Sequence, residues 1–256
     1  MDPIALLVLA GAGLGAWWLH RHQRPPERLR LTDGSRYEAD AEVALHVAVH
    51  EGKARQHEWL SSLHVLYGLL QDEAVTQAIR RSGGEVSALE DRVLAALDAH
   101  EVTAQTAKEA GWILSYAVAA GEHTGRRASC TDLWAALAKS ESEGAALVEA
   151  AGTSRVAVLF LLFHGEEPEI TEGLAGDVHV VLRNDHYTTR DFVCDVLQQV
   201  FALPPAEAAT RMQTTHEHGR AVIGRYAVPE ARVKILETRR LAKARGFPLW
   251  IGVEPV

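Results

Sequence analysis

A chain of 256 residues is long enough for one large domain or two ordinary ones, and its 47% hydrophobic and 23% charged residues are typical of a protein with a folded core. The formal net charge of −8 at pH 7 disfavours long-range attraction to nucleic acid, so no nucleic-acid partner is expected. The two cysteines, Cys130 and Cys194, form no CxxC pair. This excludes a disulfide framework and a cysteine zinc site, and it fits a reducing compartment.

The amino terminus carries an apolar run from Ile4 to Leu19 that contains no charge. It is close to the length of about 17–20 residues that crosses a bilayer. Trp17 and Trp18 suit a membrane interface, and arginines follow from Arg21 onward. We therefore predict a single-pass anchor over residues 1–22 that contacts the membrane through residues 4–20, with the amino terminus outside and the rest at the cytoplasmic face of the bacterial inner membrane. A cleaved signal peptide and a hydrophobic docking segment are the alternatives.

A polar connector over residues 23–39, headed by Pro25 and Pro26, leads into a helical unit over residues 40–164. Strand-like alternation is not sustained in this unit, and no proline interrupts it. Leucines recur at the three- and four-residue steps of a helix face, as at Leu60, Leu63, Leu66, Leu69 and Leu70. The pattern predicts an all-α domain.

The helical unit is also predicted to be duplicated. The segment SSLHVLYGLL, which starts at Ser61, aligns with SCTDLWAALA, which starts at Ser129, at an offset of about 68 residues. This offset is too long for a solenoid array and fits two pseudo-equivalent helical halves. Ser61 and Ser129 are predicted helix N-caps, and Gly83 and Gly152 are predicted helix C-caps.

An acidic stretch over residues 165–176 is predicted to be an interdomain linker. Residues 177–256 then alternate strand-like and helix-like runs in the order β-α-α-β-α-β. The fold class that we expect is α + α/β: a single transmembrane helix, an all-α duplicated domain and a small α/β domain.

The sequence lacks the common signatures of catalysis and of metal binding. GxxxxGK[ST], GxSxG and HExxH do not occur. His46 and His50 share a helix face without a third ligand nearby, whereas His216 and His218 are two apart and point in different directions on a helix. We therefore predict that the protein is not an enzyme and that it binds no cofactor and no metal ion. Ordinary, partly solvated helix positions are expected for His46, His50, His57 and His64.

Three stretches of the carboxy-terminal unit carry a family pattern. VVLRNDHYTTRDFVCDVLQQVF (180–201) contains an Asn-Asp turn, a tyrosine and a Phe-Val helix, and TTHEHGRAVIG (214–224) contains His-x-x-Gly-basic-Ala. With FPLWIGVEP as a last strand, these stretches resemble the ClpS adaptor family over residues 177–256 in order and spacing. In the helical unit, HEWLSSLHVLYGLL resembles the Clp amino-terminal domain, a double helical repeat usually found in front of AAA+ unfoldase rings.

The ClpS resemblance implies a small pocket that captures the amino-terminal residue of a substrate. Carried over by position, the residues around the peptide amine are Asn184, Asp185, His186 and His216. The residues that line or gate the side-chain pocket are Thr188, Arg190, Val193, Thr215 and Leu249. Each also has a plain structural interpretation, as turn, core or solvated surface residue, and Thr188 is the predicted N-cap of the helix that follows the turn.

Three departures from the family pattern bear on this pocket. His186 replaces a second carboxylate, so binding of an ammonium group is expected to weaken as the pH falls through about 6.5. Arg190 stands where the family has a bulky apolar gate, and Thr215 stands at an apolar wall position. They indicate a narrower or more polar pocket, or one that no longer reads amino termini.

The resemblance implies a non-catalytic adaptor that binds substrate polypeptides by their amino-terminal residue and delivers them to a Clp-type AAA+ unfoldase, and the predicted anchor would tether it to the membrane. Intramolecular docking of the two domains is expected as a possible regulatory contact. The alternative is a membrane-bound interaction scaffold, or an unfoldase decoy, whose ClpS-like domain has lost recognition of amino termini.

Overall fold

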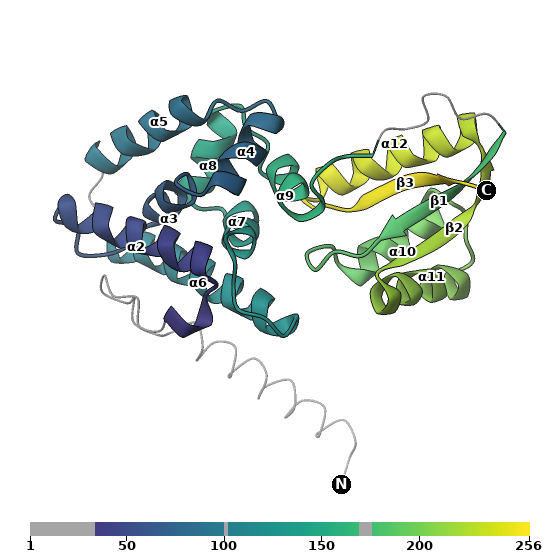
Figure 1. Ribbon diagram of the computed structural model, residues 1–256, viewed down its shortest axis with the longest axis horizontal. Helices are drawn as coiled ribbons and strands as arrows, with labels where there is room; N and C mark the ends of the chain where they lie inside the picture. The colour runs from purple at the N-terminus through teal and green to yellow at the C-terminus, as the bar shows by residue number, and fades with distance from the viewer. Residues whose placement is uncertain (1–33, 100–101, 169–175) are drawn as a thin grey trace, which may run out of the picture.

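The computed structural model describes residues 34–99, 102–168 and 176–256, and these residues form a helical unit and an α/β unit (Figure 1). The predicted anchor over residues 4–20 lies outside the described residues. Within the described part of the chain, no single helix has both the length and the hydropathy of a membrane span. The helices Glu143–Ala150 and Arg155–His164 reach these values only as a pair, which is bent by 95°.

The helices of the helical unit fall into two successive sets. The first contains a short 3-10 helix η1 (Gly34–Arg36), then α2 (Ala39–Ala54), α3 (Ser62–Leu69), α4 (Glu73–Arg81) and α5 (Val86–Ala99). The second contains α6 (Ala104–His123), α7 (Cys130–Lys139), α8 (Glu143–Ala150) and α9 (Arg155–His164). The starts of α3 and α7 are 68 residues apart, which is the offset of the sequence repeat.

Helix caps in the two sets match the sequence pattern. Ser129 Oγ accepts the Asp132 backbone N–H at 3.4 Å, and the Asp132 carboxylate accepts the Ser129 N–H at 2.9 Å. In the first set His64 takes the place of that acid, and its Nδ1 accepts the Ser61 N–H at 3.0 Å. Gly83 and Gly152 follow α4 and α8 with φ of 88° and 76°, the left-handed region that favours glycine. The predicted N-caps are confirmed, whereas the C-cap residues are Ser82 and Ala151 and each predicted glycine follows one position later.

The helical core is closely packed around α7. Trp134 of α7 is 0% exposed, and its indole N–H donates to the Arg155 carbonyl at 3.0 Å. Gly68 allows α3 to approach α2, since a Cβ there would lie 2.1 Å from the Ala44 carbonyl oxygen. Tyr37, which belongs to the predicted connector, is buried in this core beside Ala128. The packed unit therefore includes residues before position 40.

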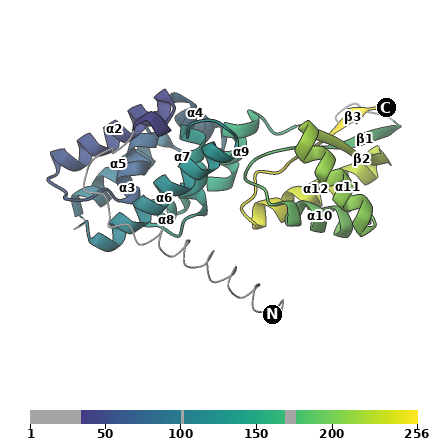
Figure 2. The same cartoon turned by 90° about the horizontal axis from the view of Figure 1, so that it is seen from below.

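The α/β unit has the predicted element order, which is confirmed. Its elements are β1 (Asp177–Arg183), α10 (Arg190–Gln199), α11 (Pro205–His218), β2 (Arg220–Ala227), α12 (Val228–Ala244) and β3 (Trp250–Pro255). The strands form an antiparallel sheet in the order β2-β1-β3. Val178, Val180 and Leu182 alternate along β1 and join the core formed with the helices, which lie on one side of the sheet (Figure 2).

Two features bring the ends of β1 and α11 together. Gly219 ends α11 with a φ of 79°, which turns the chain into β2. The Gly219 carbonyl then accepts the Asn184 N–H at 2.8 Å, directly after β1. The Asn184 turn and the last residues of α11 therefore stand side by side, at the end of the sheet that faces the helical unit (Figure 1).

The expectation of a partly solvated His64 is wrong. Its ring is fully buried, with Ser61 Oγ 2.8 Å from Nδ1 and His57 Nδ1 3.0 Å from Nε2. Burial lowers the pKa of His64 to about 4, and the neighbouring charges of His57 and Arg55 add to the effect. The folded protein thus favours the neutral ring.

This burial predicts a pH-dependent loss of stability. An unfolded histidine titrates near 6.5, so the contribution of His64 is complete above that pH and falls between pH 6.5 and 4. At pH 5 the loss is about 2 kcal/mol of unfolding free energy. Denaturant titration at pH 7 and pH 5 measures it. His64→Gln preserves a Ser-x-x-Gln capping box and is expected to remove this part of the pH dependence, whereas His50→Gln on the exposed face of α2 leaves it. If the unfolding free energy changed equally between pH 7 and pH 5 in the unsubstituted chain, His64→Gln and His50→Gln, the assignment would be contradicted.

Candidate functional site

The turn between β1 and α10 is organised by Asp185. One carboxylate oxygen accepts the N–H groups of Tyr187 at 2.8 Å and Thr188 at 2.6 Å, and the other accepts the Thr188 hydroxyl at 2.7 Å. The side chain is only 6% exposed, and burial raises its pKa. The hydrogen bonds from Thr188 and Tyr187 and the charge of Lys139 oppose that rise. A buried, hydrogen-bonded carboxyl group therefore stands at the base of the turn.

This turn borders a pocket of about 360 Å³. The apolar part of its lining includes Val193 of α10, Met212 of α11 and Leu249, which precedes β3. All of the residues predicted for the amine site and the side-chain pocket line it, and so they are brought together by the fold: Asn184, Asp185, His186, Thr188, Arg190, Val193, Thr215, His216 and Leu249. Val193 and Leu249 belong to the core of the α/β unit as well, so their structural and pocket roles coexist.

The polar residues of the pocket differ in what they contact. An Arg190 Nη2 lies 2.5 Å from His216 Nε2, so the guanidinium stands beside the ring nitrogen predicted to accept the amine. The His186 ring packs edge-on against Phe163 of α9, with ring centroids 5.4 Å apart. Burial lowers the pKa of His186, and Arg126 lowers it further. Protonation of this ring therefore begins below the pH of 6.5 expected from the sequence.

The cap of α10 corrects one expectation. Thr188 was the predicted N-cap, but its hydroxyl donates to Asp185 instead. Thr189 is the N-cap, and its Oγ1 accepts the Phe192 N–H at 3.4 Å. The two threonines are adjacent, and the sequence alone does not distinguish which one faces the turn.

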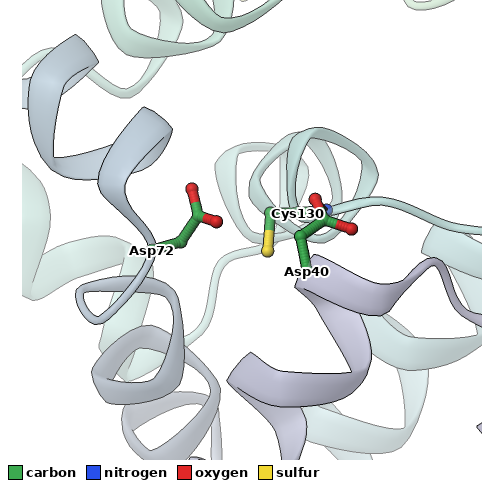
Figure 3. A group of neighbouring side chains, drawn as sticks. All are labelled: Asp40, Asp72 and Cys130. Carbon is green, nitrogen blue, oxygen red and sulfur yellow. Dashed lines mark hydrogen bonds between the residues drawn. The ribbon is translucent and has the colours of Figure 1, made fainter.

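Among the described residues, one cluster of potential metal ligands lies outside this pocket. Asp40, Asp72 and Cys130 place their ligand atoms within 4.8 Å of one another (Figure 3). Burial raises the pKa of the Cys130 thiol, and Asp40 and Asp72 raise it further. Asp72 caps α4 by accepting the Val75 N–H at 2.9 Å, and Asp40 accepts the Cys130 N–H at 3.1 Å. These helix-capping bonds account for the carboxylates, so the cluster supports no cofactor assignment.

Comparison with known proteins identifies the α/β unit. Residues 175–252 match the family described as ATP-dependent Clp protease adaptor protein ClpS. The ClpS adapter protein of Desulfatibacillum aliphaticivorans is 43% identical over 76 residues, which cover 30% of this chain and 73% of that protein. The chain belongs to the ClpS family. The ClpS domain carries the turn and the pocket described above.

Two solved structures are each similar to a part of the chain. The Agrobacterium tumefaciens ClpS2 bound to L-phenylalaninamide is 36% identical and covers 32% of this chain and 100% of its own, with a TM-score of 0.31. The Hsp104 N-terminal domain from Candida albicans is 16% identical and covers 50% of this chain and 89% of its own, with a TM-score of 0.45.

Several residues of the pocket were not predicted. Met212 lies on α11, one turn before His216, and Tyr187 occupies the ClpS turn itself. Leu182, Arg183 and Thr189 also line the pocket, and three further residues, Tyr116, His123 and Lys139, come from α6 and α7 of the helical unit. Sequence spacing does not show which residues of the two domains make contact, so these three residues of the helical unit emerged only from the structure.

Proposed function

We propose that this chain is a non-catalytic adaptor that binds a substrate polypeptide by its amino-terminal residue and presents it to the AAA+ unfoldase of an ATP-dependent Clp protease. One observation carries the proposal. The ClpS turn with Asn184 and Asp185, and His216 from α11, border the same pocket as the apolar side chains of Val193 and Leu249. Polar acceptors beside an apolar recess are what the start of a polypeptide chain requires.

The chemistry of recognition follows from these groups. A free α-amino group has a pKa of about 7.7–8.0, so it is largely protonated at pH 7 and binds to acceptors. The Asp185 carboxylate supplies negative charge, and a ring nitrogen of His216 that carries no hydrogen can accept a hydrogen bond. Burial of an apolar first side chain against Val193 and Leu249 adds about 1.5–3 kcal/mol of binding free energy.

Replacement of His216 tests this proposal. In the full chain, a peptide that begins with Phe, Leu, Trp or Tyr is expected to bind saturably, and acetylation of its amine is expected to abolish binding. His216→Ala removes an acceptor for a charged donor, which is worth about 1.5–3 kcal/mol, so the Kd should rise about tenfold or more. Fluorescence anisotropy of labelled peptides measures these constants. The matched control is His218→Ala. His218 lies two residues further along α11, and its Nδ1 is 3.3 Å from the Thr214 carbonyl oxygen of the same helix. Equal effects of the two variants would refute the assigned role.

The tether and the identity of the helical unit are part of the same proposal. The uncharged run over residues 4–20 followed by arginines supports a membrane anchor that holds the adaptor at the cytoplasmic face. We expect the full chain to sediment with membranes after a high-salt wash, and recovery in the supernatant would remove the tether. The two sets of helices with matching caps support a helical unit of the Clp amino-terminal type.

A second candidate function is an interaction scaffold that no longer recognises amino termini. The contact of Arg190 with His216 at 2.5 Å favours it, since the guanidinium lies beside the nitrogen that would accept the peptide amine. The same titration separates the two functions. Failure of every free-amine peptide to bind would support the scaffold.

A further inference from the structure

The pocket of the ClpS domain has a wall that comes from the helical unit. Tyr116 and His123 of α6 and Lys139 at the end of α7 line it together with the ClpS turn. The Lys139 ammonium lies 5.7 Å from the centre of the Tyr116 ring and 5.5 Å from the centre of the Phe247 ring, so it sits between the two units. A ClpS domain alone would lack these three side chains.

A buried hydrogen bond holds this wall against the turn. Tyr187 of the ClpS turn is 2% exposed, packs into the helical core and donates its hydroxyl to Asp132 at 2.9 Å. Asp132 is 0% exposed and also binds the Arg126 guanidinium at 2.5 and 3.0 Å. Burial raises the pKa of Asp132, but hydrogen bonds from Arg126 and Ser129 outweigh it and hold the pKa below its usual value. Tyr187 therefore meets a charged carboxylate, which makes a strong hydrogen bond.

Further contacts fix the position of the wall. The Lys139 ammonium donates to the Tyr187 carbonyl at 3.5 Å, and Phe163 of α9 packs edge-on against the Tyr187 ring at 5.7 Å between centroids. His164 lies with its Nε2 2.9 Å from the Pro248 carbonyl, beside the pocket residue Leu249. These contacts come from α7 and α9 and reach both the turn and the segment before β3, so the helical unit and the turn are set in one arrangement.

The charges around the completed pocket are unbalanced. Among the described residues that line it, Lys139, Arg183 and Arg190 are cationic, and the one carboxylate is Asp185. That carboxylate is buried and already accepts three hydrogen bonds from its own turn. A peptide ammonium that binds at Asp185 neutralises this negative charge. Lys139 is an exposed residue that lines the pocket, so its ammonium then remains as a positive charge beside the bound chain.

We infer that the helical unit completes the peptide pocket, and that Lys139 selects substrates with an acidic side chain directly behind the captured amino-terminal residue. The inference rests on the proposed capture of amino termini and adds the chemistry of the second position. Lys139 is exposed, so its effect is that of a solvent-screened ion pair, which changes the Kd by up to about fivefold.

The test compares peptides that begin with Phe and carry Asp, Asn or Lys at the second position, at low salt, with the full chain. The expected order of affinity is Asp, then Asn, then Lys, with Asp about two- to fivefold tighter than Asn. Lys139→Met should make the Kd values of the three peptides similar, and Lys139→Glu should reverse their order of affinity. Lys108→Glu makes the same charge change on the exposed face of α6 and should leave the order unchanged.

The outcomes separate this inference from the proposed function. Saturable binding with equal constants for the three peptides, or an order that Lys139→Glu does not change, overturns the selection and leaves amino-terminal capture standing. Failure of all three peptides to bind overturns both. The inference is supported if Lys139→Glu reverses the order of affinity and Lys108→Glu leaves it unchanged.

Discussion

Replacing Trp134 with alanine is expected to lower the unfolding free energy of the helical unit by about 3–5 kcal/mol. The indole is 0% exposed, so truncation leaves a large cavity at the centre of α7. It also removes the N–H donor of the Arg155 carbonyl at the start of α9. Equilibrium denaturation of the full chain, followed by far-ultraviolet circular dichroism, measures the loss.

Trp112 provides the matched control for this prediction. It lies on α6 of the same unit, is only partly buried and stacks on Tyr116 with ring centroids 5.2 Å apart. Trp112→Ala is therefore expected to cost only about 1 kcal/mol, the worth of an aromatic pair. Similar losses for the two variants would show that Trp134 is not at the centre of the packed core.

The parts of the fold that the sequence predicts are those governed by local chemistry. Ser61 and Ser129 were identifiable as N-caps because a capping box is complete within four residues. Burial of His64 was not, because it depends on His57, which approaches from the loop after α2. Tyr37 was assigned to a connector because its partner Ala128 is distant in sequence. Contacts between distant segments leave no periodicity to detect.

The candidate site divides in the same way. The turn residues, Thr215 and His216 could be predicted because the family spacing places the turn and the last helical turn of α11 at one end of the sheet. The helical wall could not, although one asymmetry pointed to it. At the third helical position the two repeats differ, with His64 in the first and Asp132 in the second. That acid proves to be the partner of Tyr187. A difference between repeats can thus mark the half that contacts another domain.

Asp185 is the residue whose replacement should affect peptide binding most. Asp185→Ala leaves the N–H groups of Tyr187 and Thr188 without their acceptor, which is expected to cost about 2–4 kcal/mol of stability and to abolish binding. Asp185→Asn separates the two effects. An amide oxygen still accepts both N–H groups and preserves the turn, but the charge that we propose attracts the peptide ammonium is gone.

We therefore expect Asp185→Asn to retain most of the stability and to raise the Kd for a Phe peptide about ten- to a hundredfold, the worth of a hydrogen bond between charged groups. Asp191→Asn, in the exposed first turn of α10, makes the same change outside the pocket and should bind normally. Because burial raises the pKa of Asp185, protonation should weaken peptide binding by the unsubstituted chain at a pH above the usual aspartate range. That acidic step should be missing from Asp185→Asn. An unchanged pH profile in this variant would mean that another group holds the amine.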